Sequence, residues 1–341
     1  MSEQIPTSTV IKTTEMHTAG EPLRVVKSGF PTPRGDTILE KVRYSRENLE
    51  RYRKLLMSEP RGHLDMFGAV LVEPDDKDAD MATMFIHNAG YSTMCGHAVI
   101  SLGRYAVDSG LVQSPSSPET RVAIQCPCGL VEAFVEYKDG KTGNVRFNSV
   151  PSFVFATGVD VDVPGYGHLT VDIAYGGAFY AFVTDSQYNF RLQDVAPEVV
   201  KYAAAATTDV LRKQLKLSHP YSNDLAFLFG TIVTDGQDEQ TDVPSTHICI
   251  FAEKQLDRSP CGSGTTARMA LLYHKGHVQL GQSRTFRSHI KSEFRAKAVQ
   301  EVTCGRYKAI QVEISGRGHY CGNSEFSLEE EDVIGRGFLI E

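Results

Sequence analysis

The sequence predicts an α/β fold of the α+β type, made of two pseudo-symmetric, strand-rich lobes that each surround one central helix. Three observations support this prediction. The chain has 341 residues, which is more than a single hydrophobic core usually supports. Most of its apolar segments are short and alternate as strands do. Two apolar helices, each directly after a Cys-Gly pair, lie about half a chain apart. We therefore expect two lobes with a cleft between them.

Apolar alternation and short apolar runs between turn residues predict the strands. They cover residues 66–72, 81–87, 121–125, 131–137, 169–183, 225–234, 246–251 and 309–315. Two other segments have the apolar spacing of an amphipathic helix. The first spans residues 45–57 and begins at Ser45 as its N-cap, and the second spans residues 197–217 and opens with Pro197. We expect both helices on the outside of the lobes.

The two central helices begin after Cys95 and Cys261, and each is followed by a glycine 15 residues after its cysteine, Gly110 and Gly276. Both helices are largely apolar, which is typical of helices buried inside a lobe. The two cysteines lie 166 residues apart, close to half the chain. This spacing indicates a duplicated plan, with a first lobe over residues 1–163 and a second over residues 164–322.

Composition narrows the class of partner. The net charge is −7 and lysine and arginine form no cluster, which argues against nucleic acid or an anionic membrane as a partner and favours a small molecule. No apolar run approaches the roughly 18 residues that cross a bilayer. The first ten residues are polar and include Glu3, unlike a secretory signal, so we expect a cytoplasmic protein. Seven cysteines in such a chain are expected to be free thiols.

The paired cysteines are the strongest chemical signal. A cysteine at a helix N-terminus faces unpaired N–H groups and the positive end of the helix dipole, which favour the thiolate. Cys95 and Cys261 are therefore candidate acid/base groups. The N–H groups that follow them would suit a substrate carboxylate, and they belong to Gly96, His97, Gly262 and Ser263. Two thiols on opposite faces of an α-carbon would invert its configuration, one removing a proton while the other delivers one.

The chain resembles the proline racemase family in motifs spread over nearly its whole length. Two of them contain the cysteines: Met94-Cys95-Gly96-His97 and Asp257-Arg258-Ser259-Pro260-Cys261-Gly262-Ser263-Gly264-Thr265. The others are Met16-His17-Thr18-Ala19-Gly20-Glu21-Pro22, Pro60-Arg61-Gly62-His63 and Val171-Asp172-Ile173-Ala174-Tyr175-Gly176-Gly177. The resemblance implies a fold like that of diaminopimelate epimerase, a homodimer, and catalysis without pyridoxal phosphate or metal. It also implies that the C-terminal residues 323–341 return to the first lobe.

The resemblance assigns roles to individual residues. Cys95 and Cys261 are the implied acid/base pair. Gly96, His97, Gly262 and Ser263 are implied to bind the substrate carboxylate or amine. Asp257 is implied to hold the ring nitrogen, and a carboxylate is a suitable partner for a secondary ammonium group, although a loop-capping role for Asp257 is an alternative.

The activity is open between members of the family. Racemases and hydroxyproline 2-epimerases carry two catalytic cysteines, whereas animal trans-3-hydroxy-L-proline dehydratases typically carry threonine at the second position, so Cys261 favours inversion of proline or hydroxyproline. The surroundings, at residues 87–99, 224–228 and 273–276, nevertheless look more like the dehydratase subgroup. The alternative is a dehydratase with Cys95 as the base and Cys261 as a proton donor, and a remote alternative is a non-catalytic small-molecule binding protein.

Overall fold

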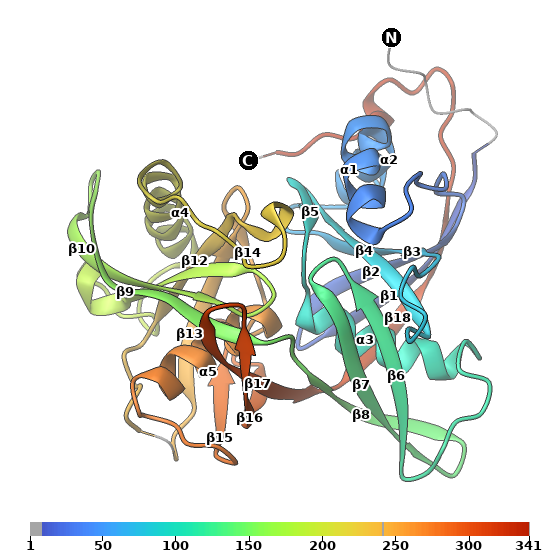
Figure 1. Ribbon diagram of the computed structural model, residues 1–341. Helices are drawn as coiled ribbons and strands as arrows, with labels where there is room; N and C mark the ends of the chain where they lie inside the picture. The colour runs from blue at the N-terminus through green and yellow to red at the C-terminus, as the bar shows by residue number, and fades with distance from the viewer. Residues whose placement is uncertain (1–8, 241, 341) are drawn as a thin grey trace.

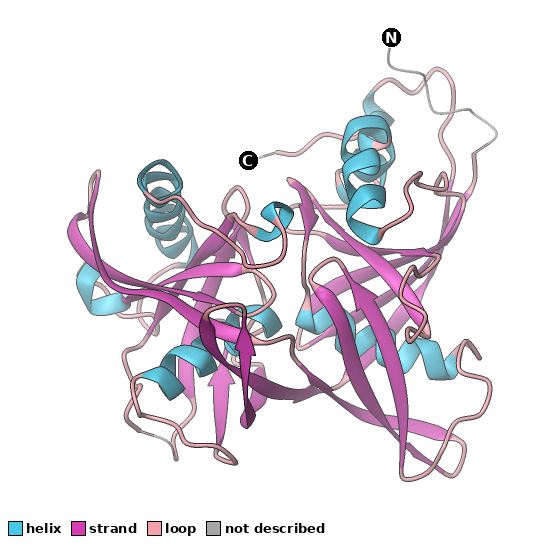
Figure 2. Ribbon diagram, in the orientation of Figure 1, coloured by secondary structure: helices cyan, strands magenta, loops and turns pink. Residues whose placement is uncertain are grey.

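The computed structural model describes residues 9–240 and 242–340. Strands dominate the molecule, and helices occupy a smaller part of it (Figure 2). The helices are α1 (Ile38–Asn48), α2 (Glu50–Met57), α3 (Gly96–Asp108), α4 (Pro197–Gln214) and α5 (Gly262–His274), with short 3₁₀ helices at Asp185–Tyr188, Asn223–Leu225 and Ile334–Arg336.

The strands of the first half, in chain order, are β1 (Ile11–Thr18), β2 (Glu21–Ser28), β3 (Phe67–Val72), β4 (Met81–His87), β5 (Gly90–Ser92), β6 (Glu119–Cys126), β7 (Gly129–Lys138) and β8 (Lys141–Asn148). Those that follow are β9 (Ser152–Val163), β10 (Gly167–Tyr175), β11 (Phe179–Thr184), β12 (Leu228–Thr234), β13 (Ser245–Phe251), β14 (Gln255–Leu256), β15 (Ser283–Arg287), β16 (Glu293–Cys304), β17 (Tyr307–Gly316) and β18 (Gly318–Phe326).

Strand pairing repeats in the two halves of the chain. In the first half, β1–β2 is antiparallel, β2–β3 parallel, β3–β4 antiparallel, β4–β6 parallel, and β6–β7 and β7–β8 antiparallel. The second half has the same sequence of pairings from β10 through β11, β12, β13, β15 and β16 to β17. A short hairpin strand, β5 or β14, precedes the cysteine in each half. The predicted pseudo-symmetric, strand-rich lobes are therefore confirmed.

The halves are joined through β17 and β18. Strand β17 pairs with β8 as well as with β9 and β16, and it lies between the two halves in Figure 1. Strand β18 pairs antiparallel with β1 of the first half. The lobe boundaries at residues 163 and 322 and the return of residues 323–341 stay predictions.

Each central helix is enclosed by the strands of its half. Helix α3 packs against β1, β6, β7, β8 and β18, and α5 packs against β9, β10, β16 and β17. Ala98, Val99 and Leu102 in α3 and Ala267 and Met269 in α5 are completely buried, as their apolar spacing predicts. Burying these helices brings their N-termini into the interior, where the two halves meet.

The outer helices differ in part from the prediction. Helix α4 begins at Pro197 as expected. The segment expected to be one helix from Ser45 to residue 57 is instead α1 and α2. Helix α1 begins after Thr37, whose side chain accepts from the Glu40 N–H while the Glu40 side chain accepts from the Thr37 N–H. This reciprocal capping box sets the helix start, so Ser45 lies buried within α1 and the prediction that it is the N-cap was wrong.

The predicted strand over residues 169–183 is also interrupted. It forms β10 and β11, which pair antiparallel around a turn at residues 176–178. Gly176 packs against the first turn of α5, where an added Cβ would lie 2.3 Å from Ser263 O. Gly177 has φ +99° and lies against Met94. The apolar pattern runs on through this turn because both strands are buried, so periodicity alone did not reveal it.

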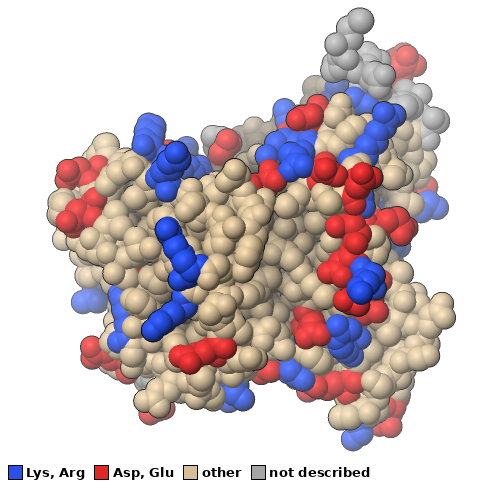
Figure 3. Space-filling model, viewed as in Figure 1, with Lys and Arg blue, Asp and Glu red and all other residues tan. Residues whose placement is uncertain are grey.

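Charged side chains are distributed over the surface in small groups. On the face in Figure 3, lysine and arginine stand among aspartate and glutamate, and no continuous basic area covers the described residues of this face. Among the described residues, no helix is both long enough and apolar enough to cross a bilayer.

Candidate active site

Helices α3 and α5 meet at their N-termini. Gly96 and Gly262 are the first residues of the two helices, and Cys95 and Cys261 are their N-caps. A Cβ added to Gly96 would lie 2.5 Å from the Gly262 Cα, and one added to Gly262 would lie 2.4 Å from the Gly96 Cα. Only glycine allows two backbones to come this close. The contact brings the two Cys-Gly pairs, 166 residues apart in sequence, into one place.

A narrow cavity lies at this contact, with a volume of about 20 Å³. All seven site residues expected from the sequence line it: Cys95, Gly96, His97, Asp257, Cys261, Gly262 and Ser263. Aromatic and apolar side chains form the rest of its wall: Phe67, Met94, Tyr180, Phe229 and Phe251. The cavity has room for about one water molecule, so the surrounding segments have to move apart for a larger ligand to enter. The catalytic and binding roles of these residues stay predictions.

Cys95 and His97 are in direct contact. The Cys95 Sγ lies 3.0 Å from the His97 Nδ1, and the His97 Nε2 lies 3.2 Å from the Pro22 carbonyl oxygen. Because a carbonyl only accepts, Nε2 carries the hydrogen and Nδ1 of the neutral ring accepts from the thiol. Burial, with the charge of Arg258, lowers the pKa of His97 to about 3. At neutral pH the imidazole is therefore a neutral acceptor facing the thiol.

The protonation of Cys95 differs from the expectation drawn from its helix position. Burial raises the pKa of the Cys95 thiol well above its ordinary value, the N–H of Ala98 acts in the opposite direction, and the Asp257 charge adds to the rise. Desolvation of the charged form outweighs the helix N-terminus. In this buried position Cys95 is a thiol, and a cationic group beside it would be needed to favour the thiolate.

Cys261 has an unusual backbone conformation. Its φ is +57° and its ψ is 104°, in a region that residues other than glycine rarely adopt. Its Sγ lies 3.5 Å from the Tyr180 hydroxyl, which in turn lies 2.8 Å from the Ser263 hydroxyl. Burial raises the pKa of Tyr180 well above its ordinary value, so its hydroxyl keeps its proton. Such conformations persist when surrounding contacts hold them, and they are frequent at active sites.

Asp257 is a buried carboxyl in the cavity wall. Its Oδ1 accepts from the Ser259 N–H at 2.8 Å and from the Ser259 hydroxyl at 2.7 Å. Burial raises the pKa of Asp257 to about 6, although the Ser259 hydrogen bonds lower it. The alternative role as a loop cap therefore describes a real contact, but the same carboxyl also faces the cavity. It is suitably placed to receive an ammonium group.

Several residues of the site were not identified from the sequence. Tyr180, Phe229 and Phe251 lie on buried strands whose side chains read simply as core, and only folding brings them to the cysteines. Glu21 stands in one of the family-like motifs but had no expected role. Its carboxyl is fully buried and accepts from the Arg258 N–H at 2.7 Å. Its position in the motif at residues 16–22 was the one feature of the sequence that could have identified Glu21 as a site residue.

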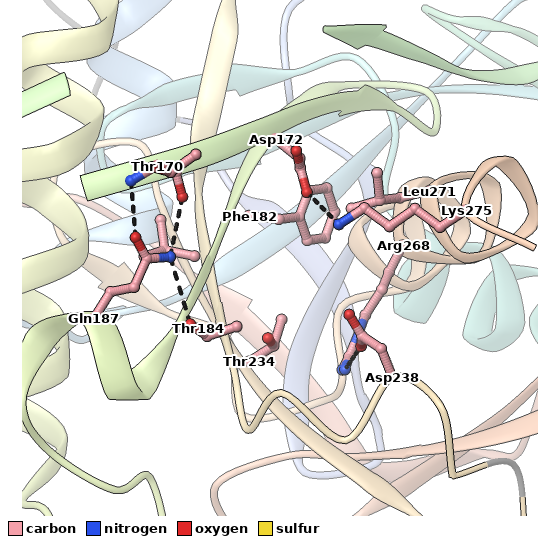
Figure 4. A pocket seen from close by; sticks show the side chains of 11 residues that line it. Thr170, Asp172, Phe182, Thr184, Gln187, Thr234, Asp238, Arg268, Leu271 and Lys275 are labelled. Carbon is pink, nitrogen blue, oxygen red and sulfur yellow. Dashed lines mark hydrogen bonds and ion pairs between the residues drawn. The ribbon is translucent and has the colours of Figure 1, made fainter. Parts of the chain in front are cut away.

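A second cavity of about 280 Å³ lies against the other end of α5 (Figure 4). Its charged groups are paired with one another: Lys275 with Asp172 at 2.6 Å, and Arg268 with Asp238 at 2.7 Å. It contains neither cysteine. Because these charged groups are already paired with one another, they indicate a structural role rather than a ligand site. We therefore place the active site at the cavity that contains Cys95 and Cys261.

Comparison with known proteins identifies the family. The proline racemase family model matches residues 13–339. A trans-L-3-hydroxyproline dehydratase from Saccoglossus kowalevskii is 56% identical over 96% of this chain and 100% of its own, and a 3-hydroxyproline 2-epimerase from Burkholderia multivorans is 38% identical over 97% and 98%. The crystal structure of a hydroxyproline epimerase from Agrobacterium vitis, with bound trans-4-hydroxy-L-proline, superimposes with a TM-score of 0.90 and 27% identity over 98% and 95% of the two chains. The chain belongs to the proline racemase family.

Proposed function

We propose that the protein is a lyase that dehydrates trans-3-hydroxy-L-proline. The observation that carries this proposal is the 56% identity, over nearly the whole of both chains, to a relative named for this reaction, against 38% to one named as an epimerase. The preference for a racemase or epimerase drawn from Cys261 therefore gives way to the dehydratase alternative. Both relatives are named for 3-hydroxyproline, which supports a 3-hydroxylated proline as the substrate.

The stereochemistry of this substrate needs only one catalytic cysteine. In a trans-3-hydroxyproline the hydroxyl and the carboxylate lie on opposite faces of the ring. The α-hydrogen is also opposite the carboxylate, so the α-hydrogen and the hydroxyl share one face. A single thiol on that face can take the proton and return it to the leaving oxygen. A second cysteine is then compatible with dehydration but not required for it.

We assign this role to Cys95. Its thiolate removes the α-proton, the C3–O bond breaks, and the departing hydroxide takes the proton from the new thiol. The products are water and the enamine 2,3-dehydroproline, which tautomerises to the cyclic imine. Cys95 ends as it began, so protons balance without another donor. His97, whose Nδ1 lies 3.0 Å from the Cys95 Sγ, accepts a hydrogen bond from the resting thiol and so orients the sulfur.

Charge complementarity supports the binding of an amino acid. The ammonium group of the substrate would pair with Asp257, and the carboxylate would face the N–H groups at the start of α3 and α5. A bound cation beside Cys95 lowers the pKa of the thiol toward neutrality. The same N–H groups stabilise the negative charge that develops on the carboxylate as the α-proton leaves.

Epimerisation at C2 is a second candidate activity, and one observation favours it. Cys261 lines the same cavity as Cys95. With thiols on both faces, protonation of the carbanion from the opposite face would compete with loss of the hydroxyl. Substrates without a 3-hydroxyl would then be inverted rather than dehydrated.

Incubation of the purified protein with single substrates tests the proposal. We expect trans-3-hydroxy-L-proline to yield the cyclic imine, detected by its reaction with 2-aminobenzaldehyde. L-proline and trans-4-hydroxy-L-proline, followed by chiral chromatography, are the controls. Inversion of either control at a higher rate than imine formation would replace the lyase by an isomerase. No turnover of any of them, together with binding, would favour the binding protein.

The pH dependence of the reaction should report the state of Asp257. Its carboxyl accepts the substrate ammonium only when ionised, and its pKa is raised to about 6. We expect kcat/KM to fall about tenfold for each pH unit below 6, because protonation removes the charge. Asp257→Asn should abolish this acid limb and lower kcat/KM by about 10²-fold or more, since a buried cation loses its partner. An unchanged acid limb in the Asn variant would remove Asp257 from ammonium binding.

A further inference from the structure

Glu21 and Pro22, at the start of β2, contact both halves of the active site. The Pro22 carbonyl accepts from His97, which faces Cys95. The Glu21 Oε2 accepts from the Arg258 N–H at 2.7 Å, and the Arg258 guanidinium lies 3.4 Å from the same oxygen. Residue 258 stands between Asp257 and Cys261. One dipeptide of the first half therefore holds the Cys95 side directly and reaches across to the Cys261 side.

The segment that Glu21 holds is one whose conformation needs support. Asp257 accepts from the Ser259 N–H and hydroxyl, and the Ser259 oxygen accepts from the Cys261 N–H at 3.1 Å. These local bonds shape the segment from within. They do not attach it to the first half of the chain. Cys261, at φ +57°, has an unfavourable backbone conformation of the kind that persists when surrounding contacts hold it.

Burying the Glu21 carboxyl costs free energy, because a polar group loses its contact with water. Its side chain is fully buried, and its Oε1 has no hydrogen-bond partner among the described residues. The charged or titratable groups that face it are Asp257, Arg258, Asp65, Cys95 and Cys249. The acidic groups outnumber the single guanidinium. Burial and then the charge of Asp257 raise the pKa of Glu21 well above its ordinary value.

We infer that Glu21 is a positioning residue that acts as a neutral clamp, holding the Asp257–Cys261 segment of the second half against the Cys95–His97 pair of the first. A neutral carboxyl still accepts the Arg258 N–H, through its carbonyl oxygen, in a weaker hydrogen bond than an ionised one would make. It adds no second negative charge beside Asp257, so the carboxylate of Asp257 remains the single partner for the substrate ammonium. This inference deepens the proposed function, because it concerns how the same site is assembled.

Two substitutions of Glu21 test whether it acts as an uncharged hydrogen-bond acceptor or as a charged carboxylate. Glu21→Gln keeps an oxygen for the Arg258 N–H and carries no charge, so its kcat/KM at neutral pH should stay close to that of the wild type. Glu21→Leu removes the acceptor, and we expect kcat/KM to fall by about 10²-fold as the segment shifts. Glu15→Leu is the matched control. It removes another part-buried carboxyl, on β1, that pairs with Arg24 and does not contact the segment.

The alkaline pH profile gives a readout that mere structural support would not change. In the wild type, ionisation of Glu21 at high pH places a second negative charge beside Asp257 and Cys95, so kcat/KM should decline. The Gln variant cannot ionise, and this decline should be absent from its profile. A Gln variant as impaired as the Leu variant at neutral pH overturns the inference, and so does an alkaline profile identical to that of the wild type.

A third measurement does not depend on the reaction. Alkylation of Cys261 by iodoacetamide, followed by peptide mass spectrometry, should be faster in Glu21→Leu than in the wild type and unchanged in Glu15→Leu. Equal rates in the wild type and the Leu variant contradict the clamp. If the Leu variant does not fold, the neutral-pH activity and the alkaline profile of Glu21→Gln still decide. If the substrate proves to be another proline derivative, the same comparisons of kcat/KM between variants and wild type are made with that substrate. A wrong proposed function is then recognised without contradicting the clamp.

Discussion

Cys95→Ser should lower the rate of dehydration of trans-3-hydroxy-L-proline by about 10³-fold. A positioned general base contributes about 10²–10⁴-fold to proton transfer, and a serine hydroxyl is far too weak an acid to supply an alkoxide at neutral pH. The contact with His97 would remain, because a hydroxyl also donates to Nδ1. The substitution thus removes the base with little change in packing, and kcat from imine formation measures the loss directly.

Cys261→Ser is the matched control for that experiment. The α-hydrogen and the hydroxyl of the substrate share a face, so we expect this variant to keep most of its dehydration activity. It should instead lose any inversion of L-proline or trans-4-hydroxy-L-proline, since inversion needs a thiol on each face. If Cys261→Ser abolishes dehydration while Cys95→Ser retains it, the two roles are exchanged. If both variants lose dehydration equally, a mechanism on one face is wrong.

Gly96→Ala should also have a large effect, because the new Cβ would lie 2.5 Å from the Gly262 Cα. The atom in the way belongs to a helix backbone and has no rotamer to change. Helices α3 and α5 would have to separate, and a displacement of about 1 Å at reacting groups costs about 10²-fold in rate. Overpacking of this kind also destabilises by about 1–3 kcal/mol. Both kcat/KM and the thermal midpoint should therefore fall.

Gly103→Ala in the same helix is the control for this substitution. Its Cβ would lie 3.2 Å from a Val145 methyl and 3.3 Å from the Ala133 Cβ, close contacts with side chains rather than with a facing backbone. Alanine also favours a helix by about 1 kcal/mol over glycine. We expect this variant to fold and to retain activity. Wild-type kcat/KM in Gly96→Ala would show that the two helix N-termini need not touch for catalysis.

The elements that could be predicted from the sequence share a physical reason. Apolar alternation records which face of a strand is buried, and it located most of the strands that form the two lobes. The repeated Cys-Gly helix start and its glycine 15 residues later revealed the duplication before any contact was known. Errors arose where a short-range contact overrode the pattern. Thr37 and Glu40 close a capping box upstream of Ser45, and a turn at Gly176 divides one apolar run.

The sequence predicted the cysteines and neighbouring residues that line the candidate site, but it did not predict the electrostatics of that site. The helix position of Cys95 argued for a thiolate, whereas burial raises the pKa of this thiol. A helix N-terminus is visible in a sequence, but the desolvation of a side chain depends on everything packed around it. For the activity, Cys261 alone pointed to inversion, whereas the similarity over the whole chain gives more support to the dehydratase alternative.

The sequence by itself determined the two-lobe plan, the two cysteine-capped helices and the family, because these follow from local periodicity and from contiguous motifs. Only the tertiary structure decided that Gly96 meets Gly262, that Tyr180 reaches Cys261, and that Glu21 holds Arg258 from the opposite half. Each of these contacts joins segments more than 80 residues apart. The Gly96 and Glu21 contacts depend on how the two halves close on one another, and the Tyr180 contact depends on how β11 packs against α5 within the second half. No local pattern of residues records these arrangements.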